Sequence, residues 1–255
     1  MAVFYGRKSQ YEIWNKKISR IVFLIWCSYS LFIICIALFE SALRKFSLAS
    51  ILAMIIVFGP IYLIADYLRR KELSTFFKYA SGLRGEAAVW YELHRLNNAY
   101  HVFEDIKLPG RDENIDFVVF GPTGLFTIEV KNHRGTIEYN GQELTRDGNK
   151  LENNFIKRSM EETLALHTHI ANVCNVTLFI TPIIVFSNYF ATLNFQQETI
   201  HNIQIIKRKL LISTILCGSS QTISNEQQII DCLNNCTYDK RVTLHKNNSL
   251  NQTKL

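Results

Sequence analysis

Two long apolar runs, residues 21–39 and 46–65, contain no charged side chain and lie before the rest of a 255-residue chain. A helix rises about 1.5 Å per residue, so the first run would cover about 28 Å, close to the thickness of the hydrocarbon core of a membrane. Only a short segment, residues 40–45, separates the runs. The sequence therefore predicts an antiparallel pair of transmembrane helices with both chain ends on one side.

The distribution of Lys and Arg predicts which side that is. Basic residues concentrate before the first run and directly after the second, at positions 7, 8, 16, 17 and 20 and at positions 69, 70 and 71. Because Lys and Arg favour the cytoplasmic side, we expect a multi-pass protein of the inner (cytoplasmic) membrane with both termini in the cytoplasm and the lipid bilayer as a partner. A cleaved signal peptide is the alternative, but its apolar region is shorter and no second run follows it.

The predicted organisation has five parts. These are a basic cytoplasmic N-terminus (1–20), two transmembrane helices (21–66), a linker (67–82), a soluble domain (83–237) and a polar tail (238–255). Residues 1–78 carry 11 Lys and Arg against 4 Asp and Glu, whereas residues 79–255 carry 17 against 18. The net charge of +6 therefore belongs to the membrane-flanking part, and it is no electrostatic signature of nucleic-acid binding by the soluble domain.

The soluble domain contains a clear β-hairpin signal. Every second residue of the runs 114–120 and 125–131 is apolar, which gives one wholly apolar face, and the opposite face is apolar near the turn and polar at the far end. Gly-Pro-Thr-Gly lies between the runs. If the turn is symmetric, Phe120 pairs with Leu125, and the same register sets Asp116 opposite Glu129. Their Cβ atoms would then be about 4.5–5.5 Å apart on one face of the hairpin.

Two facing carboxylates repel each other unless a cation lies between them. Mg²⁺ binds through one or two carboxylates and keeps several waters, so Asp116 and Glu129 are candidate Mg²⁺ ligands, with Mn²⁺ as an alternative and the Val130 carbonyl as a further ligand. Lys131 falls on the same face and would bring a positive charge to a scissile phosphate. The competing explanation is that these side chains form ordinary ion pairs at a solvated edge.

A helix is expected to begin at Gly85, with Val89, Trp90 and Leu93 on its packed face. Glu86 lies on that same face, so its carboxylate would point toward the domain interior. The alternative is that an acid in the first turn of a helix only complements the helix dipole.

Residues 85–86, 114–132 and 135–137 resemble the nuclease-related domain (NERD) family, a branch of the PD-(D/E)xK nuclease superfamily. The resemblance runs from about residue 83 to 137 and continues more weakly to about residue 236. It implies an α/β fold with a restriction-endonuclease-like α-β-β-β-α-β core and Mg²⁺-dependent cleavage of DNA, with RNA as the alternative substrate. By the resemblance the catalytic residues would be Glu86, Asp116, Glu129 and Lys131.

The sequence departs from the family pattern at one position. Where the family shows Asn-Pro-x-x-Gln before a helix, this chain has Asn154-Phe-Ile-Lys-Arg158. Arg158, with its neighbour Lys157, could contact phosphate, or it could indicate altered or lost activity. Two functions therefore stay open: a membrane-anchored metal-dependent nuclease, and a catalytically inactive, membrane-tethered nucleic-acid-binding or scaffold protein on the same fold. A purely structural membrane protein would leave the Asp-Glu-Lys pattern unexplained.

Overall fold

The computed structural model describes residues 1–6, 18–20, 22–27, 29–30, 33–34, 48–151, 153–195, 199–219 and 225–237. The chain forms two compact units, residues 10–81 and residues 1–9 with 82–255. The second of these, which we call the α/β unit, contains every predicted site residue. The predicted first membrane span and the turn after it fall mostly outside the described residues, as does the polar tail.

Helix α2 (Leu48–Leu93) is continuous and contains Pro60. It passes through the stretch predicted as a linker, and the helix expected to begin at Gly85 begins instead at Leu48. Residues 66–81 contain no proline or glycine, so nothing in that stretch interrupts the helix. Over the residues that the structure describes, no helix combines the length and apolarity needed to cross a membrane.

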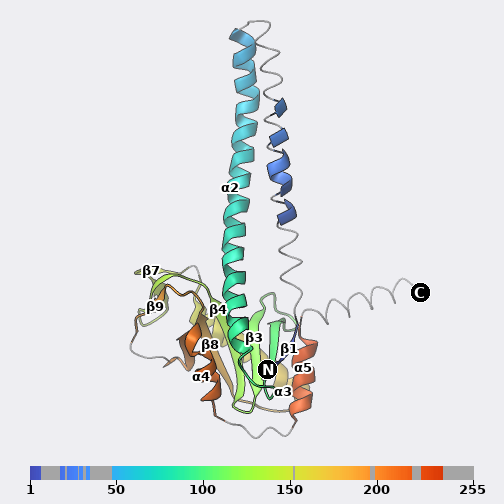
Figure 1. Ribbon diagram of the computed structural model, residues 1–255, viewed down its shortest axis with the longest axis vertical. Coiled ribbons are helices and arrows are strands. Elements are labelled where there is room, and N and C mark those ends of the chain that lie inside the picture. The colour runs from blue at the N-terminus through green and yellow to red at the C-terminus, as the bar shows by residue number, and fades with distance from the viewer. Residues whose placement is uncertain are drawn as a thin grey trace, which may run out of the picture. The chain divides into compact units, whose positions relative to one another are not determined.

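A mixed seven-stranded sheet forms the centre of the α/β unit (Figure 1). Its strands, in spatial order, are β1 (Val3–Tyr5), β2 (His101–Ile106), β3 (Ile115–Gly121), β4 (Gly124–Lys131), β8 (Ile180–Phe186), β11 (Ile203–Lys207) and β10 (Thr199–Ile200). β2, β3 and β4 are antiparallel neighbours, and β4 pairs in parallel with β8. This architecture is a mixed α/β fold compatible with a nuclease-like core.

The N-terminal strand is a finding that the sequence did not suggest. Val3–Tyr5 pairs in parallel with His101–Phe103 at the edge of the sheet. Three residues are too few to show the alternation that identifies a strand, and residues 1–20 were predicted only as a basic segment. The pairing joins the N-terminus to the α/β unit.

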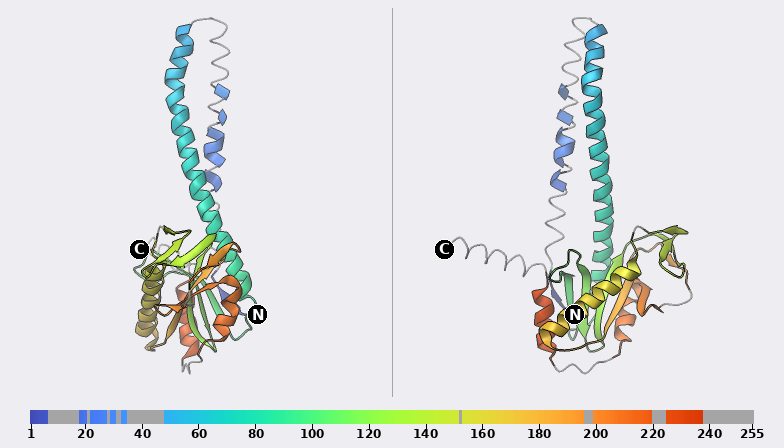
Figure 2. Two further views of the ribbon diagram at one scale, coloured as in Figure 1. Left: turned by 90° about the vertical axis from the view of Figure 1, so that its left-hand side faces the viewer. Right: turned by 180° about the vertical axis from the view of Figure 1, so that it is seen from behind.

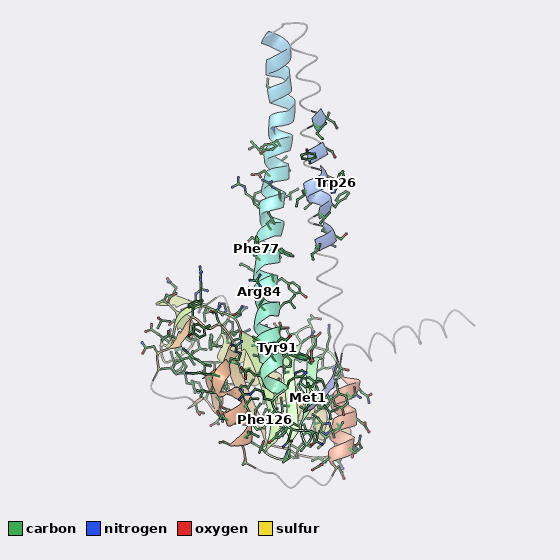
Figure 3. All side chains as sticks on the ribbon, viewed as in Figure 1. Met1, Trp26, Phe77, Arg84, Tyr91 and Phe126 are labelled. Carbon is green, nitrogen blue, oxygen red and sulfur yellow. The ribbon has the colours of Figure 1, made fainter. Side chains whose placement is uncertain are left out.

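Helices cover both faces of the sheet (Figure 2). Val118 and Phe120 of β3 pack with α3 (Phe155–Cys174) and α5 (Glu226–Asn235). The alternate residues, Phe117 and Val119, pack with the last turns of α2 and with α4 (Leu211–Leu216), which follows the short 3-10 helix η1 (Arg208–Leu210). Phe126 of β4 belongs to this second layer and is buried among the side chains of the unit (Figure 3). The predicted apolar alternation is thus confirmed.

A second, four-stranded sheet follows β4 and β8. Its order is β7 (Asn149–Lys150), β6 (Leu144–Arg146), β5 (Gly135–Tyr139) and β9 (Ala191–Leu193). β5 follows β4 and β9 follows β8, and Gly135 pairs in parallel with Ala191. The two parallel neighbours of the large sheet therefore continue as parallel neighbours in the small one.

Candidate active site

The β3–β4 hairpin has the predicted register. Phe120 pairs with Leu125, and the ladder continues to Phe117 and Ile128. One further step along the same register sets Asp116 opposite Glu129. The backbone N–H of Val130 donates a hydrogen bond to Oδ2 of Asp116 at 2.7 Å, which fixes this carboxylate against the neighbouring strand.

Glu129 is a buried acid, with 3% of its surface exposed. Its Oε1 accepts a hydrogen bond from Nζ of Lys131, the next residue but one on the same strand. Its Oε2 is buried and accepts no hydrogen bond from any residue that the structure describes. A buried carboxylate oxygen without a donor is costly, so this atom is where the site would gain most from a cation.

Helix α3 adds a cation, Arg158, and a further acid, Glu162, to this cluster. Nε of Arg158 lies 3.5 Å from Oε1 of Glu129 and 2.8 Å from Oε1 of Glu162, which is also buried. Arg158 and Glu162 are one helical turn apart and so share a face of α3. The side chain of Asn154 begins the helix by accepting a hydrogen bond from the N–H of Lys157.

Arg158 and Lys157, the two candidate phosphate contacts, lie beside acidic side chains. The guanidinium of Arg158 is held among carboxylates, which include Glu113 at 3.6 Å. Lys157 is exposed, and its Nζ lies 3.8 Å from a carboxylate oxygen of Glu161. Arg158 is therefore part of the carboxylate cluster, whereas Lys157 is not brought to it.

Glu86 reaches the cluster because α2 packs closely at Gly85. A Cβ atom at position 85 would lie 2.7 Å from Oγ of Ser187 and 2.8 Å from Cβ of Asn132. At such distances a side chain at position 85 would force its neighbours to shift, so glycine allows the helix to approach the ends of β4 and β8. The charge on Glu86 consequently interacts with those on Asp105 and Glu129.

Three acids of the cluster, Glu86, Asp116 and Glu162, have raised pKa values. Burial, then the charges of Asp105 and Glu129, raise the pKa of Glu86 to about 8. Burial, then Glu129 and Glu86, raise the pKa of Asp116 well above its ordinary value, although Lys131 and the Val130 N–H act against the shift. Burial, then Glu129, raise the pKa of Glu162 to about 7, against the effect of Arg158. Four acids thus face two cations, Lys131 and Arg158, and the positive charge is insufficient.

The residues fit a divalent ion bound by few protein ligands. Within the described residues, no three His, Cys, Asp or Glu side chains form a group that could hold a metal ion. Mg²⁺ commonly uses only one or two carboxylates and completes its shell with water and phosphate. Asp116 and Glu129 are a pair of metal ligands of that kind, because Oε2 of Glu129 accepts no hydrogen bond from a described residue.

Aromatic side chains border the cationic side of the cluster. Nζ of Lys131 lies 4.4 Å from the centroid of the Phe155 ring, and His133 stacks on the same ring at 5.6 Å. Phe155 is buried at the start of α3. The contact with Phe155 limits the positions that the Lys131 side chain can take.

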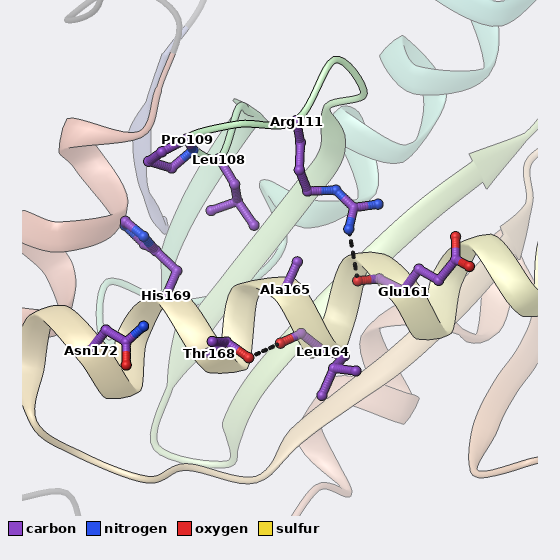
Figure 4. Close-up of a pocket in the computed structure, with 9 residues that line it drawn as sticks. All are labelled: Leu108, Pro109, Arg111, Glu161, Leu164, Ala165, Thr168, His169 and Asn172. Atoms are coloured by element: carbon purple, nitrogen blue, oxygen red, sulfur yellow. Dashed lines mark hydrogen bonds between the residues drawn. The ribbon is translucent and has the colours of Figure 1, made fainter.

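A pocket of about 490 Å³ lies away from this cluster, between the segment after β2 and helix α3 (Figure 4). Its lining includes Leu108, Arg111 and His169 but none of Glu86, Asp116, Glu129 and Glu162. Arg111 crosses it to donate a hydrogen bond to the backbone oxygen of Glu161 at 3.3 Å. The cluster at the hairpin, rather than this pocket, contains the acids with raised pKa values, which makes it the candidate active site.

The sequence reasoning brought together Glu86, Asp116, Glu129 and Lys131 and missed Glu162 and Asp105. Glu162 follows Arg158 by four residues on an amphipathic helix, and that spacing was an available signal. Asp105, with a φ of 56°, lies in β2 and accepts a hydrogen bond from Asn114 at 2.6 Å. Nothing in its local sequence marked it.

Comparison with known protein families finds the nuclease-related domain, NERD, at residues 81–187. The match covers α2 from its last turns, the β2–β4 meander, the small-sheet strands β5–β7, α3 and β8, and so includes all four predicted catalytic residues. The comparisons with curated proteins and with solved structures found no match.

Proposed function

We propose that residues 83–237 form a Mg²⁺-dependent nuclease that hydrolyses phosphodiester bonds of DNA. The observation that carries this proposal is that the buried Oε2 of Glu129 accepts no hydrogen bond from a described residue. Glu129 and Asp116 belong to a cluster with more acids than cations. The NERD match at residues 81–187, which include this cluster, supports a nuclease-related function.

Asp116, Glu129 and the Val130 carbonyl would hold the ion. When bound, it supplies Lewis-acid stabilisation of the phosphate charge and a lowered pKa for water. Lys131 holds a positive charge beside the reacting phosphate, and its contact with Phe155 limits the positions that its Nζ can take. Glu86, whose pKa is about 8, can accept and release a proton near neutral pH.

Arg158 orients the metal-binding acid rather than the substrate. It shares its guanidinium between Glu129 and Glu162, so it limits the rotamers of Glu129 from the α3 side. In this arrangement Arg158 stands in for the Gln of the family pattern as a positioning residue.

The test is cleavage of plasmid DNA by the full-length protein in Mg²⁺ or EDTA. The proposal expects cutting in Mg²⁺ only, and loss of cutting in Asp116→Asn and in Lys131→Met. Asp112→Asn removes an exposed acid four residues before Asp116 and is the matched control. Cutting that persists in EDTA, or in both site variants, would contradict the proposal.

One observation favours a second candidate, an inactive nucleic-acid-binding or scaffold protein. Arg158 and Lys131 both lie against Oε1 of Glu129, so part of its charge is already neutralised without a metal. If the wild-type protein binds DNA but does not cut it under any divalent ion, this second function is the correct one.

The membrane anchor and the cytoplasmic location are a separate part of the proposal, and they rest on the uncharged runs and the Lys and Arg distribution. β1 and β2 are neighbours in one sheet, so residues 3–5 and the site share a compartment, as an even number of spans requires. A reporter fused after Leu255 should be active in the cytoplasm. Activity only outside the cytoplasm would overturn this part alone.

A further inference from the structure

The two most exposed large apolar side chains that the structure describes are consecutive. Tyr189 is 84% exposed and Phe190 is 75% exposed. Their ring centroids are 5.4 Å apart and the rings are nearly perpendicular, at 89°. Scattered single apolar residues on a surface need no explanation, but an adjacent exposed pair is typical of a binding surface.

The backbone holds this pair in a defined position. The side chain of Asn188 accepts a hydrogen bond from the N–H of Phe190 at 3.0 Å, and its carbonyl accepts one from Ala191 at 3.2 Å. The carbonyl of Phe190 accepts a further bond from the N–H of Gly135 at 3.2 Å. The rings are thus exposed by the fold of an ordered turn, which reduces the entropy lost when they bind a partner.

The turn lies beside the exit of the strand that carries Glu129 and Lys131. Lys131 pairs with Phe186 at the ends of β4 and β8, and the N–H of Ser187 donates to the carbonyl of Lys131 at 2.9 Å. Phe190 is three residues beyond Ser187, so its Cα lies within about 11 Å of that contact. The turn that carries the exposed rings therefore starts at the strand end that carries Lys131.

Unpaired positive charge accompanies the rings. Arg134, directly before Gly135, is exposed, and so is Arg146, whose Nη1 lies 3.3 Å from Nδ1 of His133. Neither arginine forms an ion pair with a described residue. Exposed aromatic rings next to basic side chains are the combination that binds single-stranded nucleic acid, because bases stack on the rings while the cations contact the backbone.

We propose that Tyr189 and Phe190 form a stacking platform for the bases of a single-stranded nucleic acid, which Arg134 and Arg146 help to hold next to the carboxylate cluster. This names the substrate class of the proposed nuclease and, in that respect, rests on the proposed function. The bases of a single strand can turn a face toward an aromatic ring, whereas the bases of a duplex are stacked between their neighbours.

The test is equilibrium binding of labelled oligothymidylate, oligouridylate and a DNA duplex to the full-length protein in EDTA, where no metal-dependent cleavage occurs. Tyr189→Ser/Phe190→Ser should weaken binding of the single strands about tenfold or more, since each stacked base contributes ~1–3 kcal/mol. Duplex binding should change by less than about twofold. The matched control is Phe179→Ser, an exposed aromatic at the opposite end of β8.

A ring-retaining variant keeps the test decisive if the double variant folds poorly. Tyr189→Trp should bind single strands like the wild type, and its added fluorescence should be quenched by oligothymidylate. Unchanged single-strand affinity in a folded double variant, or an unquenched tryptophan, would overturn the platform. The platform would also be overturned if Tyr189→Ser/Phe190→Ser lost binding to vesicles of anionic phospholipid while it kept binding to the oligonucleotides.

The outcome separates the platform from the nuclease. Ring-dependent binding in EDTA without any cleavage in Mg²⁺ would support the platform and refute the nuclease. Metal-dependent cleavage together with single-strand binding that does not depend on the two rings would support the nuclease and refute the platform.

Discussion

The two ends of the β3–β4 hairpin have the same backbone and opposite chemistry. At the turn, Gly121 pairs with Gly124, the Tyr100 hydroxyl meets Oγ1 of Thr123 at 3.0 Å, and Thr123 donates to a backbone carbonyl of α4 at 2.6 Å. At the open end, Asp116 and Glu129 are held among further acids, and one carboxylate oxygen has no described donor. The turn end is built for stability, whereas the open end gives up stability in the way that functional sites do.

Phe126, on the turn half of β4, is the side chain that should contribute most to stability. It is fully buried, so Phe126→Ala should lower the free energy of unfolding by about 3–5 kcal/mol through lost burial and a cavity. Denaturant unfolding of the full-length protein measures this change. Cleavage per folded molecule should be unaffected, and Leu164→Ala at an exposed position is the control. A loss below about 1 kcal/mol would remove the contrast between the two ends.

Glu129→Gln should show the opposite behaviour. It should lower kcat/KM for DNA cleavage by about a hundred- to a thousandfold, because it removes a charged metal ligand worth several kcal/mol in the transition state. Stability in EDTA should change little, because the variant removes the repulsion of Glu129 with Asp116 and Glu86 together with its ion pairs to Lys131 and Arg158. Single-turnover cleavage and thermal unfolding give the two values, with Glu161→Gln as the control. A variant that is both active and less stable would mean that Glu129 is structural.

Glu86 should make the metal-free protein less stable at alkaline pH. Its pKa of about 8 when folded exceeds that of an ordinary carboxyl, so the folded state binds more protons than the unfolded state between about pH 4.5 and 8. The free energy of unfolding should therefore fall as the pH rises, by about 2–3 kcal/mol between pH 6 and pH 9.

Thermal unfolding in EDTA at about pH 6 and about pH 9 measures this slope, which Glu86→Gln should reduce. Glu161→Gln, at an exposed position, should leave the slope as in the wild type. An identical slope in wild type and Glu86→Gln would show that Glu86 does not carry it.

Gly85→Ala should have the smallest effect. The added Cβ meets Ser187 and Asn132, but alanine also favours the helix, so the net cost should be about 1 kcal/mol. Displacement of α2 should shift Glu86 and change the pH profile of cleavage. Gly82→Ala adds a Cβ to open space one turn earlier and should leave that profile unchanged. An unchanged profile in Gly85→Ala as well would show that the close approach is not needed.

The local part of this site could be predicted from sequence, and the non-local part could not. The alternation along residues 114–131 and the Gly-Pro-Thr-Gly turn determine the register, and the register sets Asp116 opposite Glu129. Arg158 and Glu162 meet Glu129 because of how α3 packs on the sheet, which no short spacing encodes. Likewise β1 is too short to show a period, and the parallel pairing of β5 with β9 joins segments far apart in the chain.

The most direct test of the account is calorimetric titration of Mg²⁺ into the full-length wild-type protein and into Asp116→Asn and Asp112→Asn. The account predicts one bound ion in the wild type and in Asp112→Asn, and its loss in Asp116→Asn. Mg²⁺ at about a hundred times its Kd should then raise the unfolding free energy by about 2.7 kcal/mol only where the ion binds. Equal binding by all three proteins, or by none, would contradict the claim that the open end of the hairpin is a metal site.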